Sequence, residues 1–281
     1  MTNSASSIRP LLHLAACLAF AATARCETVI STGTETASAK PVIKEALVDP
    51  ASPRQDGGFA FFETPYEGLA IEGVGTIPAG RVWASIRTPE STVSIGKRNG
   101  VRFIQQTDAN LTDSIQFHAA VTESLPLTLR VLLIFERDSW SALNGSGKAA
   151  FGNAGEISFR GNNGAFQGGG ARFAPVVRSG DKFYIGNDVV TIDAKIAAFV
   201  EADRIATSFP QLGNQMFTAF DPAEPDFGGL DLASLSGNVP GSSLSDITAV
   251  GLFAEYEKNF EAPGANEFNI GSFQATVEAA R

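Results

Sequence analysis

Short apolar runs recur along the chain from Phe59 onward, and clusters of glycine, asparagine, aspartate and serine separate them. Several runs alternate apolar and polar residues, which is typical of strands with one buried face. The clearest runs cover residues 81–87, 114–121, 127–137, 215–220, 246–256 and 266–277. This pattern predicts an all-β fold, a jelly-roll or concanavalin-like β-sandwich of two antiparallel sheets with at most one or two short helices.

Two segments depart from simple alternation. Residues 127–137 are apolar on both faces at their centre, which predicts a strand in the middle of a sheet with both faces covered. Residues 193–206 place four apolar side chains roughly on one helical face, although their Val and Ile content suits a strand equally. A helix and a strand both stay open for this second segment.

Glycines mark two predicted hairpins. Asn99 and Gly100 lie between two alternating runs and supply the positive φ angles that a tight turn demands. The three glycines at 168–170 come before ARFAPVV, which alternates as a strand does, and residues 179–181 then turn the chain into KFYIG. A phosphate-binding loop needs glycines directly before a helix, whose N-terminal amides bind the anion. This stretch therefore predicts a hairpin and no nucleotide site.

The first 24 residues have the features of a secretory signal peptide. Arg9 is the only charged side chain before LLHLAACLAFAA, which is too short to span a bilayer. Ala22-Thr23-Ala24 then gives the small-x-small pattern that signal peptidase accepts, so residues 1–24 are predicted to be removed. The alternative is a lipobox over residues 14–17, which would make the protein an outer-membrane lipoprotein anchored at Cys17. We therefore expect a secreted or periplasmic protein.

Removal of residues 1–24 leaves 257 of the 281 residues. Residues 25–57 mix Thr, Ser, Ala and Pro without a sustained period, which predicts a linker or a loosely attached leading segment. Residues 58–281 are assigned to one β-sandwich domain, a length that leaves room for a second small domain before residue 150. The sequence leaves the oligomeric state open.

Charge and cysteine content exclude several function classes. After residue 24 the chain has 20 Lys and Arg (21 less Arg9) against 30 Asp and Glu, a net charge of −10. Such an acidic surface repels phosphate backbones, so nucleic acid is not an expected partner. Cys26 is then the only cysteine and His118 the only histidine, which excludes an intramolecular disulfide and argues against structural zinc. No cofactor and no membrane span are predicted.

The C-terminal part carries a family resemblance in residues 171–186, 216–227, 243–256 and 266–277. These stretches resemble the jelly-roll sandwich modules of secreted bacterial proteins. Many of those proteins carry a PEP-CTERM sorting tail, and the wider set includes carbohydrate-binding-like domains. The resemblance spans about residues 160–280 and implies a fold and a compartment rather than a reaction. The last residues, TVEAAR, contain no sorting motif, which favours free secretion.

Strand alternation predicts a sugar-binding face. In residues 81–87 the small apolar side chains point one way and Trp83 points the other way, onto the polar face. Aromatic rings stack on the apolar faces of pyranoses, while polar side chains bind the hydroxyls. The predicted platforms are Trp83 and Tyr184, and the predicted polar contacts are Arg81, Arg87, Gln116 and Lys182. The leading hypothesis is a non-catalytic protein that binds a polysaccharide or cell-surface glycan. The alternative for Trp83 is a ring covered by a loop.

A catalytic alternative rests on a second resemblance. Jelly-roll alginate lyases carry an Arg-bearing strand, a Gln-x-His strand and a Tyr- and Lys-bearing strand, and this chain is similar in order only. The resemblance implies that Arg87 and Gln116 neutralise a uronate carboxylate. It implies further that His118 or Tyr184 removes the α-proton and that Tyr184 protonates the leaving oxygen. The family's Tyr-x-Lys-x-Gly motif is missing, and the acidic net charge disfavours a polyanionic substrate.

Two groups of carboxylates are further candidates. Glu255 and Glu257 alternate onto one strand face and could serve a glycoside hydrolase, whereas an edge strand protected by acids is the simpler interpretation. A Pro- and Gly-rich loop gathers four carboxylates that suit calcium, namely Asp221, Glu224, Asp226 and Asp231. Its alternative is a solvated acidic loop. The third function considered is a structural envelope or matrix protein.

Overall fold

The computed structural model describes residues 26–32, 44–48, 54–56, 59–66, 69–71, 75–77, 79–87, 100–105, 114–119, 127–140, 148–163, 170–192, 205–258 and 266–279. Strands dominate these residues, which contain no helix of seven residues or more. Within the same ranges, no helix is long and apolar enough to cross a bilayer.

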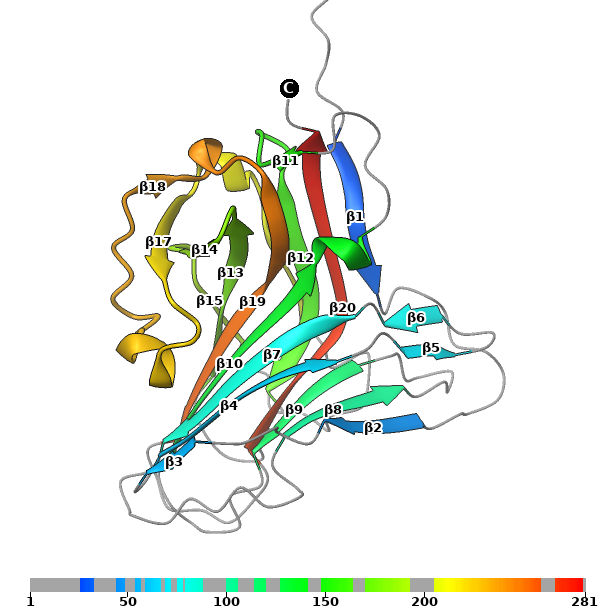
Figure 1. Cartoon of the computed structure of the whole chain (residues 1–281), viewed down its shortest axis with the longest axis vertical. Coiled ribbons are helices and arrows are strands. Elements are labelled where there is room, and N and C mark those ends of the chain that lie inside the picture. Colours follow the sequence, from blue (N-terminus) through cyan, green and yellow to red (C-terminus); the bar gives the residue numbers. More distant parts are fainter. Residues whose placement is uncertain are drawn as a thin grey trace, which may run out of the picture.

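The strands form two large antiparallel sheets and one short pair (Figure 1). The eight-stranded sheet contains β1 (Cys26–Thr32), β2 (Lys44–Val48), β8 (Gly100–Gln105), β9 (Ser114–Ala119), β11 (Ala149–Ala150), β12 (Glu156–Asn163), β16 (Ile205–Phe209) and β20 (Asn266–Ala279). The ten-stranded sheet contains β3 (Arg54–Asp56), β4 (Phe59–Tyr66), β7 (Gly80–Arg87), β10 (Leu127–Glu136), β13 (Ala171–Ser179), β14 (Lys182–Gly186), β15 (Val190–Ile192), β17 (Met216–Phe220), β18 (Val239–Pro240) and β19 (Ile247–Lys258). The short pair is β5 (Leu69–Ile71) with β6 (Gly75–Ile77), and the 3₁₀ helices are η1 (Arg137–Ser139), η3 (Leu212–Asn214), η4 (Pro225–Gly229) and η5 (Gly241–Ser243).

The two large sheets pack face to face, and side chains from both fill the space between them. Phe135 of β10 lies against Phe273 of β20, and Phe159 of β12 lies against Phe173 of β13, with ring centroids 4.9 Å apart in each pair. Such ring pairs join one sheet directly to the other and bury a large apolar area. The predicted β-sandwich of two antiparallel sheets is confirmed.

Strand β10 lies inside the ten-stranded sheet, between β7 and β19. Its inner side chains, including Leu133 and Phe135, belong to the core between the sheets. Leu132 and Ile134 point to the outer face of the same sheet and are also buried. The prediction of a central strand covered on both faces is therefore confirmed.

The outer face of the ten-stranded sheet is covered by the connection between β17 and β18. This connection, residues 221–238, is called the strap below; it contains η4 and is the gold segment at the left of Figure 1. The strap contributes Phe227, Leu230, Leu232 and Leu235 to an outer cluster with the sheet residues Trp83, Leu132, Ile134, Val176 and Phe253. The sheet thus carries a hydrophobic layer on each face.

Strand β20 attaches the N-terminal strand to the sandwich. Strand β12 pairs along one side of β20, while β9 and β1 share the other side, with Cys26 of β1 opposite Glu278. Val29 and Ile30 of β1 are buried in the core between the sheets. Residues 25–57, predicted as a linker or a loosely attached leading segment, contain β1, β2 and β3, each of which pairs with a strand of one of the two large sheets. The partner strands of β1 and β2 are β20 and β8, which lie far away along the chain, so no local pattern reveals these two pairings. Strand β3 pairs with the adjacent β4.

The segment after Gly170 forms a hairpin, as predicted. Strands β13 and β14 pair from Val176 opposite Ile185 to Ser179 opposite Lys182, and Gly180 in the turn has a φ of 58°. A Cβ atom added at Gly180 would meet no atom within 4 Å. The turn therefore requires glycine for its backbone conformation and not for space.

Gly180→Ala is expected to lower the free energy of unfolding by about 1 kcal/mol, because a side chain disfavours the left-handed conformation. Gly180→Asn is the matched control, and its loss should be smaller because asparagine tolerates this conformation better. Urea denaturation of the three proteins measures both effects. Equal stability of the wild type and the alanine variant would contradict the turn geometry.

Some predictions concern residues outside the described ranges. They are the signal peptide at 1–24, the strand before Asn99, and most of the segment 193–206, of which only Ile205 and Ala206 are described, at the start of β16.

Candidate functional site

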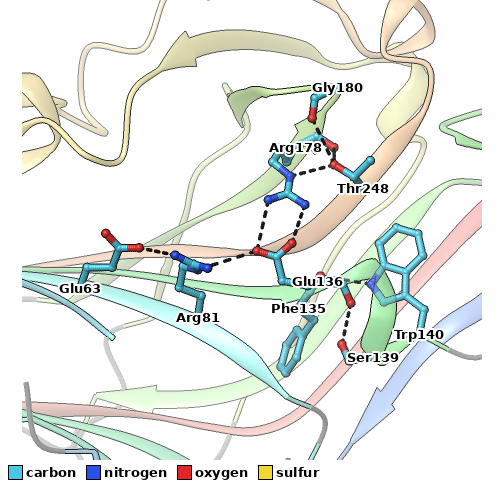
Figure 2. A network of polar contacts seen from close by, with 9 residues as sticks. All are labelled: Glu63, Arg81, Phe135, Glu136, Ser139, Trp140, Arg178, Gly180 and Thr248. Atoms are coloured by element: carbon cyan, nitrogen blue, oxygen red, sulfur yellow. Dashed lines mark hydrogen bonds and ion pairs between the residues drawn. The ribbon is translucent and has the colours of Figure 1, made fainter. Parts of the chain in front are cut away.

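Arginine and glutamate side chains form a continuous chain of polar contacts on the outer face of the ten-stranded sheet (Figure 2). We call Glu63, Arg81, Glu136, Arg178 and Thr248 the outer polar patch; they come from β4, β7, β10, β13 and β19. Ala249 of β19 lies opposite both Glu136 and Arg178 in the register. Because its side chain is a single methyl group, the two longer side chains reach across it and meet.

Glu136 is the central acceptor of the patch. Arg178 donates from Nη1 to Oε1 at 3.2 Å and from Nη2 to Oε2 at 2.5 Å, while Arg81 Nε lies 3.9 Å from Oε1. Arg178 Nε also donates to Thr248 Oγ1 at 2.8 Å, and Arg81 Nη1 donates to Glu63 Oε1 at 2.5 Å. A two-point contact between a guanidinium and a carboxylate fixes both groups in one plane.

Two aromatic rings support the arginines. The Arg81 guanidinium carbon lies 5.7 Å from the centroid of Trp83, and that of Arg178 lies 5.8 Å from the centroid of Phe183. The two rings meet edge to face, with centroids 5.8 Å apart. Cation–π contacts of this kind add to the ion pairs in fixing the guanidinium planes. The patch is therefore a preorganised array of donors and acceptors.

The patch is charge-balanced and partly open to solvent. Its two arginines and two glutamates have side chains that are between 26% and 40% exposed. Ion pairs at this exposure contribute little to stability, since water screens them. Their N–H groups and oxygens can exchange contacts with a bound molecule, and hydrogen bonding to a polar ligand is the chemistry that they offer.

A second charged group crosses the same sheet face beside the strap. Four residues lie directly opposite one another across β7, β10, β19 and β13, in the order Ser85, Arg130, Glu255 and Arg172. Glu255 is fully buried, with Arg130 Nε donating to Oε2 at 2.7 Å and Arg172 Nη2 lying 2.6 Å from Oε1. We call these four residues the buried charge row.

Asp226 links the strap to the buried charge row. Ser85 Oγ donates to its Oδ1 at 2.7 Å, Arg130 Nη1 lies 2.9 Å from Oδ1, and Arg87 Nη2 lies 2.6 Å from Oδ2. The Asp226 side chain is 5% exposed, so these contacts replace its hydration. This carboxylate is therefore an anchor that fixes the strap to the sheet.

Burial sets the protonation equilibria of the row. Burial raises the pKa of the Glu255 carboxyl above its ordinary value, and the hydrogen bond and charge of Arg130 offset only part of that rise. For Arg130, burial acts to lower the pKa, but its hydrogen bond to Glu255 and the charge of Asp226 outweigh burial and raise it. Arg130 therefore stays cationic.

The structure separates the residues of the predicted sugar-binding face. Arg81, Trp83 and Arg87 lie on the outer face of β7, as alternation predicted, but Trp83 is only 4% exposed. Its ring contacts Arg81 and Phe183 and shares the outer cluster with apolar residues of the strap, which fits the alternative of a ring covered by a loop and leaves no open platform. Tyr184 packs against the core between the sheets, on the opposite face from Trp83.

The remaining predicted sugar contacts lie elsewhere. Lys182 is exposed at the start of β14, where alternation places it on the same side as Tyr184. Gln116 lies on β9, in the eight-stranded sheet, opposite Asn269 of β20. Of the six predicted ligand contacts, only Arg81 and Trp83 therefore belong to the neighbourhood of the outer polar patch.

The residues of the lyase alternative are divided in the same way. Gln116 and His118 lie on β9 of one sheet, while Arg87 and Tyr184 lie on β7 and β14 of the other. Arg87 contacts Asp226 on the outer face, and Tyr184 faces the core. Arg87 and Tyr184 therefore lie on opposite faces of the sheet, although their order along the chain resembles that of the lyases.

Glu255 does not belong to an edge strand. Strand β19 pairs with β10 on one side and β13 on the other, so the interpretation of an edge protected by acids is wrong. Glu257 lies 3.1 Å from Arg172, and both carboxylates of the proposed hydrolase pair are thus ion-paired on a central strand.

The calcium candidates do not converge. Asp226 is occupied by cationic side chains, while Asp221 and Asp231 each accept a hydrogen bond from a backbone N–H two residues ahead. The bond from Ala233 lowers the pKa of Asp231. Among the described residues, no three His, Cys, Asp or Glu side chains are grouped so as to bind a metal. The loop is acidic because one carboxylate is an anchor and two others stabilise turns.

No protein-family model matches the chain, and no curated protein matches it. Among solved structures, the chain is similar to the solution structure of CtCBM11, a carbohydrate-binding module with a β-sandwich fold. The identity is 11%, the TM-score is 0.25, and the match covers 85% of this chain and 98% of the other.

Sequence reasoning missed Glu63, Glu136, Arg178 and Thr248. Alternation alone could have placed Arg178 on the face of Val176, and Glu136 on the face of Ile134. The missing information was the strand order, which sets β10, β19 and β13 side by side although they lie far apart in the chain. Only the pairing shows that these side chains meet.

Proposed function

We propose that the protein is secreted and binds a neutral glycan, or a glycan-bearing surface partner, through the outer polar patch without catalysing a reaction. The observation that carries the proposal is the Arg81–Glu136–Arg178 array, which is fixed by ring contacts and partly open to solvent. Sugar hydroxyls both donate and accept hydrogen bonds, and this array offers both kinds of group.

Charge balance supports a neutral ligand. Two guanidiniums and two carboxylates cancel within the patch, so it presents no net field to attract a polyanion. Each carboxylate is in contact with an arginine, which favours a binding role over that of a free acid or base. The acidic chain as a whole also favours a neutral partner.

Arg178→Ala is expected to weaken binding of a neutral oligosaccharide about 30-fold, because it removes a multi-donor group whose loss also releases Glu136. The probe is the strongest binder from an array of neutral oligosaccharides, measured by titration calorimetry. Arg137→Ala is the matched control: Arg137 follows Glu136 directly and lies 3.6 Å from Asp246. Its affinity should stay within about twofold of the wild type.

Glu136→Gln is a second, gentler variant that keeps the side-chain shape and removes its charge. It should weaken binding of the same oligosaccharide about tenfold, because both arginines lose the negative charge that they share and one of its two acceptor oxygens becomes an NH₂ donor. Unchanged affinity in both Arg178→Ala and Glu136→Gln would refute the patch as the site. Release of unsaturated ends from alginate would support the lyase alternative. No binding and no cleavage would support a structural envelope role.

Secretion is a separate part of the proposal, and the first 24 residues support it. Expression of the full chain in a bacterium with a secretory pathway is expected to yield a mature protein that starts at Arg25. Intact-mass spectrometry of the exported protein measures the cleavage position. A lipid-modified N-terminus at Cys17 would instead establish the lipoprotein alternative.

A further inference from the structure

We propose that the strap, residues 221–238, is a lid: it opens as a unit while the sandwich stays folded, and its opening uncovers an aromatic surface beside the outer polar patch. This goes beyond the proposed binding function, because the opening does not depend on any ligand. Three features of the described residues support it: backbone strain, anchoring at a few side chains, and a turn-based backbone without sheet pairing.

The strap contains a left-handed turn. Asp226, Phe227, Gly228 and Gly229 have φ angles of 53°, 55°, 66° and 76° in succession. For residues with a side chain, each such conformation is unfavourable, and a run of four is rare outside sites where the surroundings impose it. Strain of this kind favours opening of the strap once the contacts of its anchoring side chains with the sheet are broken.

Two adjacent side chains, those of Asp226 and Phe227, anchor the left-handed turn, and further along the strap Leu232 is 3% exposed and Asp231 lies 4.0 Å from Arg172. The Asp226 carboxylate contacts Ser85, Arg87 and Arg130 of the sheet. The Phe227 ring is 2% exposed and meets Phe253 edge to face at 5.0 Å between centroids. Asp226 and Phe227 lie within the left-handed turn itself, so the contacts that impose the strain are among those that hold the strap closed.

The strap backbone forms turns of its own. In the described part of the chain, its backbone hydrogen bonds run from Glu224 to Asp221, Phe227 to Glu224, Leu230 to Phe227 and Ser234 to Asp231. Near its end, Gly237 N–H donates to the Asn187 side chain at 3.2 Å, which marks the point where the strap rejoins the sheet. Opening between residues 222 and 236 therefore breaks no strand ladder among the described residues.

The surface beneath the strap is apolar and aromatic. It consists of Trp83, Leu132, Ile134, Val176 and Phe253, all buried in the closed form. Trp83 lies under Arg81 and so belongs to both this surface and the neighbourhood of the outer polar patch. An open strap would join a ring-lined surface to an array of hydrogen-bonding groups, the combination that sugar-binding sites use.

Hydrogen exchange of the full chain, read by mass spectrometry without ligand, tests the opening. In the wild type, amides of the strap are expected to exchange at least about 100-fold faster than those of β10 and β19. Asp226→Asn should raise exchange in the strap about tenfold or more and that of β10 by much less, because the strap loses its charged anchor whereas β10 loses one contact, that of Arg130. Ser85→Ala, which removes one hydrogen bond to Asp226, should raise strap exchange about fivefold.

Asp221→Asn is the matched control in the same strap. Among the described residues its carboxylate accepts a local bond from the Ala223 N–H, which an amide oxygen can also accept, so strap exchange should stay near the wild-type rate. The lid proposal would be overturned if the strap and β10 exchanged at equal rates in the wild type and if the Ser85 and Asp226 variants shifted both rates together. These outcomes are independent of glycan affinity, so the failure of one proposal leaves the other testable.

Discussion

Phe253→Ala is expected to lower the free energy of unfolding by about 4 kcal/mol, because it removes a fully buried ring from the outer cluster and leaves a cavity. Phe253 is 0% exposed and lies between Phe220 and Phe227, which it meets edge to face at 6.4 and 5.0 Å between centroids. Removing this ring therefore costs ring contacts with both strand β17 and the strap. Urea denaturation followed by circular dichroism measures the loss.

The matched control for Phe253 is another large apolar residue of the same sheet. Met216 is 39% exposed on β17, so Met216→Ala should change stability by no more than about 0.5 kcal/mol. A loss below about 1 kcal/mol for Phe253→Ala would show that the outer face is loosely packed. The second hydrophobic layer would then contribute little to the fold.

Gly251→Ala is the other change with a large expected effect. It should lower the free energy of unfolding by about 3 kcal/mol or more. Gly251 of β19 lies opposite Ile134 of β10 and Val176 of β13. A Cβ atom there would overlap the carbonyl oxygen of Leu133 and lie 2.8 Å from the Ile134 Cα atom. Both obstacles are backbone atoms of a central strand, which cannot rotate away as a side chain can.

Thermal unfolding measures the effect at Gly251, and we expect a midpoint lower by about 6 to 12 °C for a chain of this size. Gly180→Ala provides the comparison, since the same methyl group is added where nothing lies within 4 Å. A Gly251→Ala protein no less stable than Gly180→Ala would contradict the close approach of β10 and β19.

Local patterns predicted the parts of this fold that depend on neighbouring residues. The hairpin around Gly180 and the two covered faces of β10 follow from turn chemistry and from apolar runs. The same reasoning should have placed β19 inside the sheet, because residues 247–256 are also apolar on both faces.

Pairing between distant segments was beyond local reasoning. The outer polar patch needs β4, β7, β10, β19 and β13 in that order, and only long-range pairing produces it. The cover over Trp83 had a weak signal, since Phe227, Leu230, Leu232 and Leu235 recur within an otherwise acidic and glycine-rich loop. Apolar residues spaced in this way within a loop indicate that the loop packs against something.

The pairing of β1 with β20 has a mechanical consequence. Cys26 lies opposite Glu278, so the chain enters and leaves the sandwich at the same end of one ladder. Tension applied between the two ends would load one residue pair at a time and unzip the ladder from Cys26 inward, and it would not shear all pairs at once. A domain stretched in this way yields at low force.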